Sequence, residues 1–486
     1  MTSPEEDIVS GMPVEQAPAA DEGSGETELE VRAAASARVV LLARVVGLVA
    51  TFLGSVALAR ALGPDGRGAH GFFVAVTVIL VAVAGLSLPV GDYILMTRMG
   101  AARRALAANG VWLAVAAATV STLVVGAAEA LLGFLPPELT AVPAWPAAIF
   151  LAIAGFAYNA HQLQLSLAGG RALLGAFLSF GTYAIAAVGY VFLLLLGGGL
   201  PAAIWMLVAA PYLAAAVASF ARPPFSAVSL GSFDRPLARR TLHEGLRFYP
   251  GELAAMLHLR LDVILLGILT PASTVGMYVV AYQTAEPILV IASAAQATIL
   301  AFGGSSDAAD RSAAVARLIR ETIVLAVGLC VVAVLLAPLI LPAIYGQAFA
   351  ASVQPFLLLL PAVLMLAIGR IAAAELTRRN RLEATVVVAV AAMLTNLCLN
   401  LILIPILGAT GAAIASLVSY SAQAGLALAY LHRIAGMPWR AIVPGSRDVV
   451  AVVSGWNPKA FVGAVRRWRA RTSGPSAGSG DAGTDR

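Results

Sequence analysis

LRFYPGELAAMLHLRLDVILLGIL, residues 246–269, decides the fold, because it is long and apolar enough to span a bilayer and still carries ionisable residues near its middle. A helix needs about 20 residues to cross a hydrocarbon core of roughly 30 Å. Ionisable side chains at that depth are costly in lipid and therefore face a partner charge or a hydrated cavity. Besides Arg247 at its start, the stretch contains four of them: Glu252, His258, Arg260 and Asp262. It predicts a membrane helix beside a polar chamber, which is typical of a transporter.

The composition of the whole chain points the same way. Hydrophobic residues fill 60% of the 486 positions, charged residues fill 12%, and the mean hydropathy is +0.88. Soluble domains average about 45–50% apolar and about 25% charged residues, so this chain is too apolar for a soluble fold. The two cysteines, Cys330 and Cys398, lie in separate apolar runs without metal-ligand spacing. We expect no disulfide, metal site or cofactor, and no binding to nucleic acid.

Charge clusters, prolines and glycines divide the chain into twelve predicted spans. These cover residues 38–61, 70–90, 105–128, 144–166, 172–196, 202–220, 247–269, 276–302, 321–343, 352–374, 384–407 and 410–432. The longest internal connection, 221–246, separates an N-terminal lobe (38–220) from a C-terminal lobe (247–432). A Leu-x-Pro repeat at 62–64 and 269–271 supports two parallel halves. The predicted fold class is an all-α polytopic membrane protein with about twelve transmembrane helices in two six-helix lobes.

The distribution of arginine predicts the orientation. The even-numbered connections between spans contain arginines, whereas the odd-numbered ones contain only Arg67. Because cytoplasmic connections are enriched in basic residues, both termini should be cytoplasmic in a cell-membrane protein. Residues 1–37 begin with nine acids and no basic residue in the first thirty, which indicates a disordered acidic tail and not a signal peptide. Residues 433–486 form a basic tail: 447–470 is either an amphipathic helix on anionic inner-leaflet lipids or unstructured, and a disordered end follows.

The ionisable residues of the C-terminal lobe support two interpretations. His258 and Asp262 are four residues apart on one helix face, and Arg260 points roughly the opposite way. Glu286 lies near mid-membrane just before Pro287, where a kink is expected. In the first interpretation, Arg260 binds an anionic headgroup in a cavity while Asp262, Glu286 or His258 balances the charge or couples transport to a proton. In the second, Arg260 and Glu286 form a structural ion pair.

Other polar residues in the spans also have two interpretations. Arg44 either extends to the inner headgroups or supplies a second phosphate contact, for which the forked guanidinium is suited. Asn159 and Gln162 in the fourth span, and Asn396 and Asn400 in the eleventh, carry amides. Such amides suit sugar hydroxyls or hydrogen bonds between helices. No P-loop or hydrolase motif occurs in the sequence. We therefore predict no catalytic residues, and a transporter that is not an enzyme.

Six motifs then resemble, in order, a known family. They are ARALGPDGRG (59–68), GLSLP (85–89), LDVILLG (261–267), VGMYVVAY (275–282), YGQAF (345–349) and NLILIPILGATGAA (400–413). This set resembles the polysaccharide repeat-unit (Wzx-type) flippases of the multidrug/oligosaccharidyl-lipid/polysaccharide (MOP) exporter superfamily. The resemblance implies two six-helix lobes around a central, cationic cavity. It also implies a lipid-linked oligosaccharide as cargo, carried on undecaprenyl pyrophosphate and moved across the cytoplasmic membrane for cell-surface polysaccharide synthesis.

The same resemblance implies H⁺ or Na⁺ as a coupling ion, and glycan polymerase or glycosyltransferases as further partners. A MATE-like cation-coupled multidrug antiporter is the nearest alternative, and it would favour acidic residues in the N-terminal spans. Glu129, at the end of the third span, is the only acid within those predicted spans. A membrane glycan polymerase or ligase is a less favoured alternative, because it would carry a large outer loop. The longest predicted outer connection, 129–143, is short.

Overall fold

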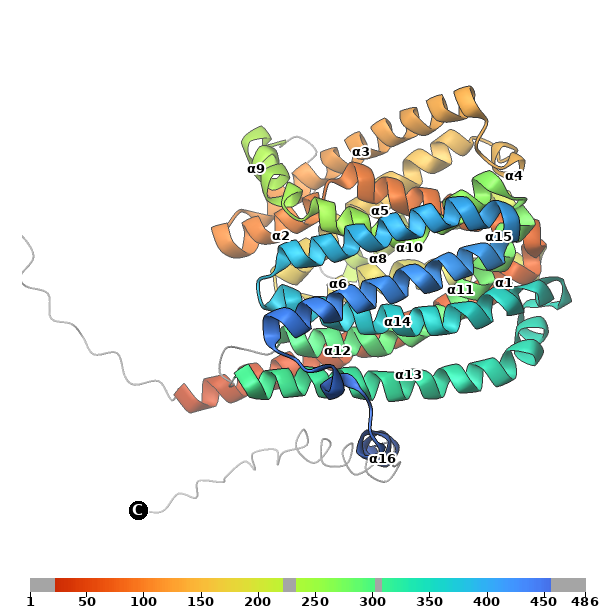
Figure 1. The fold of residues 1–486 in the computed structure, drawn as a ribbon. Coiled ribbons are helices and arrows are strands. Elements are labelled where there is room, and N and C mark those ends of the chain that lie inside the picture. The colour runs from red at the N-terminus through yellow and green to blue at the C-terminus, as the bar shows by residue number, and fades with distance from the viewer. Residues whose placement is uncertain (1–21, 222–232, 302–307, 456–486) are drawn as a thin grey trace, which may run out of the picture.

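The computed structural model describes residues 22–221, 233–301 and 308–455, which contain helices and no strands. Long helices run side by side across Figure 1, with α3 at the top and α13 at the bottom. Helices α2 and α9 lie at the left end of the bundle, and α4 lies at the right end. The long helices therefore run from one end of the bundle to the other.

The first half of the chain begins with a long kinked helix. Its elements are α1 (Glu22–Gly85), α2 (Leu88–Met99), α3 (Arg103–Leu132), α4 (Pro137–Thr140), α5 (Trp145–Ala168), α6 (Ala172–Ala176), the π-helical turn η1 (Phe177–Gly181), α7 (Thr182–Leu196) and α8 (Leu200–Ala221). Helix α1 contains the first two predicted spans. Gly63, with φ 65° and ψ −175°, breaks the helix between them. Glycine reaches this left-handed region without a steric penalty. Pro64 then begins the second span, as proline does at helix starts.

The second half ends with a similar kinked helix. Its elements are α9 (Arg235–Leu246), α10 (Tyr249–Leu269), α11 (Ala272–Ala285), the 3₁₀ turns η2 (Glu286–Ile288), η3 (Gln347–Ser352) and η4 (Trp439–Ile442), α12 (Leu289–Ala301), α13 (Ala308–Tyr345), α14 (Val353–Arg378), α15 (Leu382–Ala435) and α16 (Ser446–Gly455). Gly408, with φ 54°, divides α15 into the eleventh and twelfth predicted spans. The turn η2 interrupts the eighth span at Pro287, where the sequence predicts a kink.

Eight of the described helical stretches are long and apolar enough to cross a membrane. Two of them contain the breaks at Gly63 and Gly408 and so provide two spans each. Helices α5 and α10 are also long, but polar side chains make them less apolar. All twelve predicted spans fall mainly on helices. The prediction of an all-α polytopic membrane protein is confirmed.

The boundaries differ from the sequence-based ones in three places. Helix α1 begins at Glu22, inside the tail predicted over 1–37, and the Glu- and Ala-rich sequence there favours a helix. Helix α9 occupies part of the predicted connection 221–246. Helix α16 covers only the start of the predicted segment 447–470, and residues 456–486 and 1–21 lie outside the described residues.

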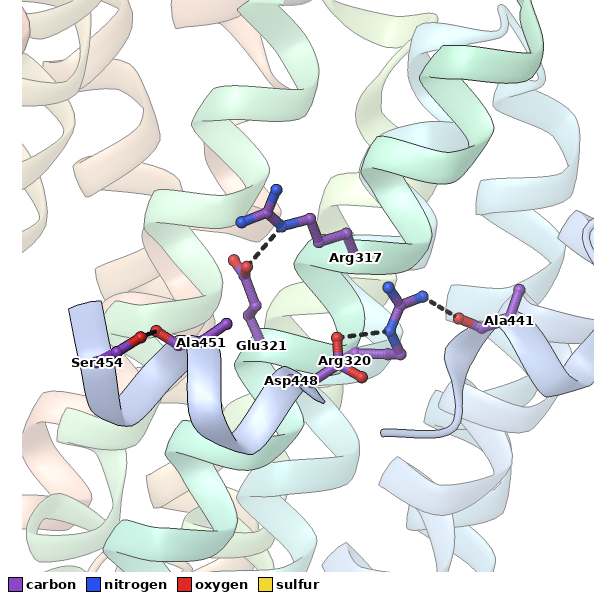
Figure 2. A network of polar contacts seen from close by, with 7 residues as sticks. All are labelled: Arg317, Arg320, Glu321, Ala441, Asp448, Ala451 and Ser454. Atoms are coloured by element: carbon purple, nitrogen blue, oxygen red, sulfur yellow. Dashed lines mark hydrogen bonds and ion pairs between the residues drawn. The ribbon is translucent and has the colours of Figure 1, made fainter. Parts of the chain in front are cut away.

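Helix α16 is attached to α13 by a polar network that Figure 2 shows from close by. Arg320 of α13 donates from Nε to Asp448 Oδ1 (3.0 Å) and from its Nη1 to the carbonyl of Ala441. The Gly445 N–H and the Arg320 guanidinium lower the pKa of Asp448 below its ordinary value. The ionised carboxylate holds α16 against α13, below the bundle in the view of Figure 1.

Two clusters of buried apolar residues form the core. One joins α10 to α15 and includes Tyr278 and Phe356, together with Ala59 and Ala75 of α1. The other joins α1, α3, α5, α7 and α8 around Phe72 and Ile153. Helix α1 thus contributes to both clusters.

Helices α1 and α11 cross closely at two glycines. A Cβ atom placed on Gly68 would lie 1.7 Å from the carbonyl oxygen of Ala272, and one on Gly276 would lie 2.1 Å from that of Pro64. No side chain fits between these backbones. The contact joins the start of the second span to the start of the eighth.

This crossing generates a prediction about stability. Gly68→Ala should force α1 and α11 apart and lower the free energy of unfolding by about 1–3 kcal/mol, as overpacking does. The measurement is the thermal midpoint of the purified protein in detergent. The matched control is Gly126→Ala on α3, where an added Cβ meets nothing within 4 Å. Equal midpoints for the two variants would contradict the close crossing.

Candidate functional site

A cavity of about 280 Å³ lies in the middle of the bundle, between elements of both halves. Its lining residues are Thr51, Ser55, Leu58, Arg67, His70, Val74 and Val78 of α1, Tyr183, Ala186, Ala187 and Tyr190 of α7, Leu207 of α8, Arg260 of α10, Tyr282 and Gln283 of α11, and Glu286 of η2. Two guanidinium groups and one carboxylate give this lining a net charge of +1 with histidine neutral. The cavity therefore favours an anion.

Arg67 is the most deeply buried cation of the cavity, with only 2% of its surface exposed. Its Nη2 donates to Gln283 Oε1 and to Ser55 Oγ (3.3 Å), and Ser55 also donates to the Gln283 oxygen (2.6 Å). The Nε of Arg67 has no hydrogen-bond partner among the described residues. Arg67 thus places a buried guanidinium at the cavity, and one of its donors is left unpaired.

Arg260 lines the same cavity, next to a carboxylate. Its Nη2 donates to Glu286 Oε1 at 3.1 Å, and its guanidinium lies 5.0 Å from the centre of the Tyr282 ring. Glu286 remains 40% exposed. The ion-pair interpretation and the cavity interpretation of Arg260 are therefore compatible, since the ion pair itself lines the cavity. A cation–π contact and one carboxylate leave other guanidinium donors for a ligand.

Aromatic hydroxyls and an imidazole complete the polar lining. His70 Nε2 and the Tyr190 hydroxyl lie 3.0 Å apart, and their rings meet edge to face. Tyr183 lines the cavity from the same helix as Tyr190. Hydroxyl and imidazole groups both donate and accept hydrogen bonds, which suits polar, uncharged parts of a ligand.

Asp262 and His258 face away from the cavity. Asp262 accepts hydrogen bonds from the Tyr278 hydroxyl, from Ser416 Oγ (3.5 Å) and from the N–H of Val263 (2.8 Å). His258 is buried, with its ring edge-on to Tyr420 at 4.8 Å. Both residues therefore lie inside the C-terminal half, and neither touches Arg260.

The four amide residues are also buried away from the cavity. Asn159 donates to Thr182 Oγ1 and to the carbonyl of Pro211, both at 3.2 Å. Asn400 donates to Asn396 (2.9 Å), which donates to Ser419 (3.1 Å). Gln162 is buried in α5. The contacts of Asn159 join α5 to α7 and α8, and the Asn396–Ser419 contact joins the two parts of α15 on either side of Gly408. Arg44 belongs to α1, but its side chain lies outside the part of the chain that the structure describes.

A second buried charged cluster has no counterpart in the sequence-based prediction. His161 Nδ1 lies 2.5 Å from Asp92 Oδ2, and Thr241 donates to Asp92 Oδ1 at 3.2 Å. Asp92 belongs to α2, beyond the predicted end of the second span, and so was not counted among the acids of the N-terminal half. The contact joins α2, α5 and α9, and it does not reach the central cavity.

No protein-family model matches the sequence, and no curated protein matches it. Solved structures do resemble the fold. An inward-facing multidrug resistance MATE family transporter of the MOP superfamily superposes with a TM-score of 0.58 at 15% identity, over 80% of this chain and 94% of the other. The lipid II flippase MurJ in an inward closed conformation gives 0.65 at 12% identity, over 85% and 89%. A MOP superfamily transporter from Pyrococcus furiosus gives 0.53 at 16% identity, over 82% and 94%.

The chain shares the fold of MOP superfamily transporters. At these identities the likeness concerns the fold, and the chemistry of the cavity has to come from this chain's own residues. Among those, Arg67 is the residue that the sequence analysis missed, because it was counted as part of a connection. Its signal was the helix-starting Pro64, which places Arg67 within the first turn of a helix.

The different surroundings of Glu286 and Asp262 predict different reactivities. In a chain with Cys330 and Cys398 replaced by alanine, Glu286→Cys should react with a charged, water-soluble methanethiosulfonate. Asp262→Cys should react at least ten times more slowly, because Asp262 is 3% exposed. Val334→Cys, exposed on the outer face of α13, is the lipid-side control and should also stay unlabelled. Equal labelling of the Glu286 and Asp262 positions would contradict the assignment of the cavity.

Proposed function

We propose that this protein is a flippase that moves a lipid-linked oligosaccharide, carried on undecaprenyl pyrophosphate, across the cytoplasmic membrane for cell-surface polysaccharide synthesis. The observation that carries the proposal is that two arginines, Arg67 and Arg260, line one central cavity. Each can offer forked donors to a phosphate. The ordered motifs that resemble Wzx-type flippases agree with this cargo.

In the proposed cycle, the headgroup enters the cavity and its pyrophosphate lies between Arg67 and Arg260. Arg67 turns its guanidinium partly away from Gln283 and Ser55 toward the pyrophosphate. Arg260 turns partly away from Glu286. The hydroxyls of Tyr183 and Tyr190, with His70, accept and donate to the sugar.

The release of Glu286 provides a means of coupling. A carboxylate that loses its guanidinium partner in a membrane cavity is poorly stabilised as an anion and tends to take up H⁺ or Na⁺. Rebinding of Arg260 after the headgroup leaves would expel that ion. Glu286 therefore carries the proposed coupling role, whereas Asp262 and His258 support α10 from its other face.

The proposed moving bodies are the halves 38–220 and 247–432, joined by 221–246. The two apolar core clusters support this division, with α1 belonging to both. The end of the bundle with α2 and α9 carries most of the arginines between spans, so we assign it, and both termini, to the cytoplasm. The protein is then a transporter and not an enzyme, with glycosyltransferases and a glycan polymerase acting before and after it.

A MATE-like antiporter is the second candidate, and Glu286 is the observation that favours it. A half-exposed carboxylate in a central cavity could receive a cationic drug. The neighbouring Arg260 and the buried Arg67 oppose this, because the net charge of the lining is positive.

Reconstitution distinguishes the two candidates. Liposomes containing the protein and a fluorescent polyprenyl-pyrophosphate-linked sugar should expose that sugar to an impermeant quencher. Arg67→Gln and Arg260→Gln should each slow this exposure at least tenfold, equivalent to about 1.4 kcal/mol. Arg260→Lys should recover part of the rate, since an ammonium lacks the forked geometry. Arg433→Gln, at an exposed arginine outside the cavity, should leave the rate unchanged.

Two results would oppose the proposal. Normal rates in both Arg67→Gln and Arg260→Gln would show that neither arginine binds the headgroup. Uptake of a cationic dye that is driven by a proton gradient and abolished by Glu286→Gln would favour the antiporter.

A further inference from the structure

A second hollow, of about 680 Å³, lies on the outside of the first half between α1, α3 and α9. Its walls are mainly apolar and include Leu80 and Val83 of α1 and Leu113, Val120 and Val124 of α3. Val120 and Val124 are 58% and 56% exposed, so this groove opens toward the surrounding lipid. It shares no lining residue with the central cavity.

Two arginines of α9, Arg235 and Arg239, close one end of the groove. The position of that end follows from Asn109 of α3, which exchanges two hydrogen bonds with the backbone of Asp234 (2.8 and 2.9 Å). Asn109 precedes Leu113 by one turn, so the arginines stand at the Leu113 end. The groove thus begins cationic and continues apolar.

The length of the groove matches one leaflet. Leu113 and Val124 are eleven residues apart on α3, which at about 1.5 Å per residue is roughly 16 Å, half of a hydrocarbon core of roughly 30 Å. Trp112, 41% exposed, lies one residue before Leu113. Tryptophan is enriched at the level of the lipid headgroups. The cationic end therefore lies at the depth of a headgroup, and the apolar part lies at the depth of one leaflet's chains.

The charges at this end are available for an anion. Arg235 and Arg239 also line an adjoining surface hollow of about 900 Å³ that includes Arg240. The acidic residue of that hollow, Glu244, pairs with Arg247 at 3.5 Å. No ion pair joins Arg235, Arg239 or Arg240 to another described residue. Two exposed guanidinium groups thus line this end of the groove, and a third, that of Arg240, lines the adjoining hollow.

We propose that this groove binds one anionic phospholipid of the leaflet on the arginine-rich side. An acyl chain lies between α1 and α3, and the headgroup phosphate accepts hydrogen bonds from Arg235 and Arg239. Burial of the chain in the groove and the forked phosphate contact act on the same molecule. The bound lipid fastens α9, the helix within the connection between the halves, to the first half.

Native mass spectrometry of the full-length protein tests the proposal. Protein from nanodiscs that contain equal phosphatidylglycerol and phosphatidylcholine should retain one phosphatidylglycerol on gentle release from the disc. Arg235→Gln/Arg239→Gln should reduce this retention at least tenfold. Ala116→Trp, which fills the groove from α3, should reduce it without removing a charge. The charge-matched control, Arg98→Gln/Arg433→Gln, removes two exposed arginines outside the groove and should retain the lipid.

Three results would overturn the proposal. Equal retention by the Arg235/Arg239 variant and by the control would show that these two arginines do not bind the lipid phosphate. Unchanged retention by Ala116→Trp would show that the groove does not hold the acyl chain. Displacement of the lipid by glycerol 3-phosphate, which has the headgroup chemistry and no chain, would show a phosphate site without a lipid.

Discussion

The crossing of α1 and α11 is the contact on which the rest of the site depends. Backbone meets backbone at Gly68 and Gly276, with no room for a Cβ. Arg67 precedes Gly68, and Gln283 lies two turns after Gly276 on α11. The close approach therefore brings a buried guanidinium to its amide partner across the two halves. A charge with 2% exposure would be very costly without such partners, so the packing and the electrostatics of the cavity have one origin.

Helix α10 performs a complementary task, because its two central charges face different surroundings. Asp262 is held by Tyr278, Ser416 and the Val263 N–H inside the C-terminal half. With Asp262 fixed there, helical geometry turns Arg260 toward the cavity and Glu286. A buried, fully hydrogen-bonded carboxylate thus sets the direction of a cation that lies two residues away. The cavity keeps a positive net charge, which suits a pyrophosphate better than a cationic drug.

Much of this could be predicted from the sequence, because lipid imposes strong constraints on it. Apolar length and helix breakers located all twelve spans, including the pairs joined at Gly63 and Gly408. Helical spacing also separated Arg260 from Asp262. The partners of each polar residue could not be predicted, since they depend on how distant helices pack. The amides of Asn159 and Asn396 bond neighbouring helices, whereas Arg67 reaches the cavity from a position that seemed to be a loop. Asp92 and His161, 69 residues apart in the sequence, meet only in the folded chain.

The central claim is that one anionic headgroup lies between Arg67 and Arg260, and a cryo-electron microscopy structure tests it most directly. The sample is the wild-type protein in nanodiscs with a polyprenyl-pyrophosphate-linked sugar. We expect density for two phosphates inside the central cavity, with phosphate oxygens about 3 Å from both guanidinium groups. The Arg260–Glu286 contact should be lengthened in the same map. Phosphate density elsewhere on the protein, with both arginines still held by Gln283 and Glu286, would contradict the claim.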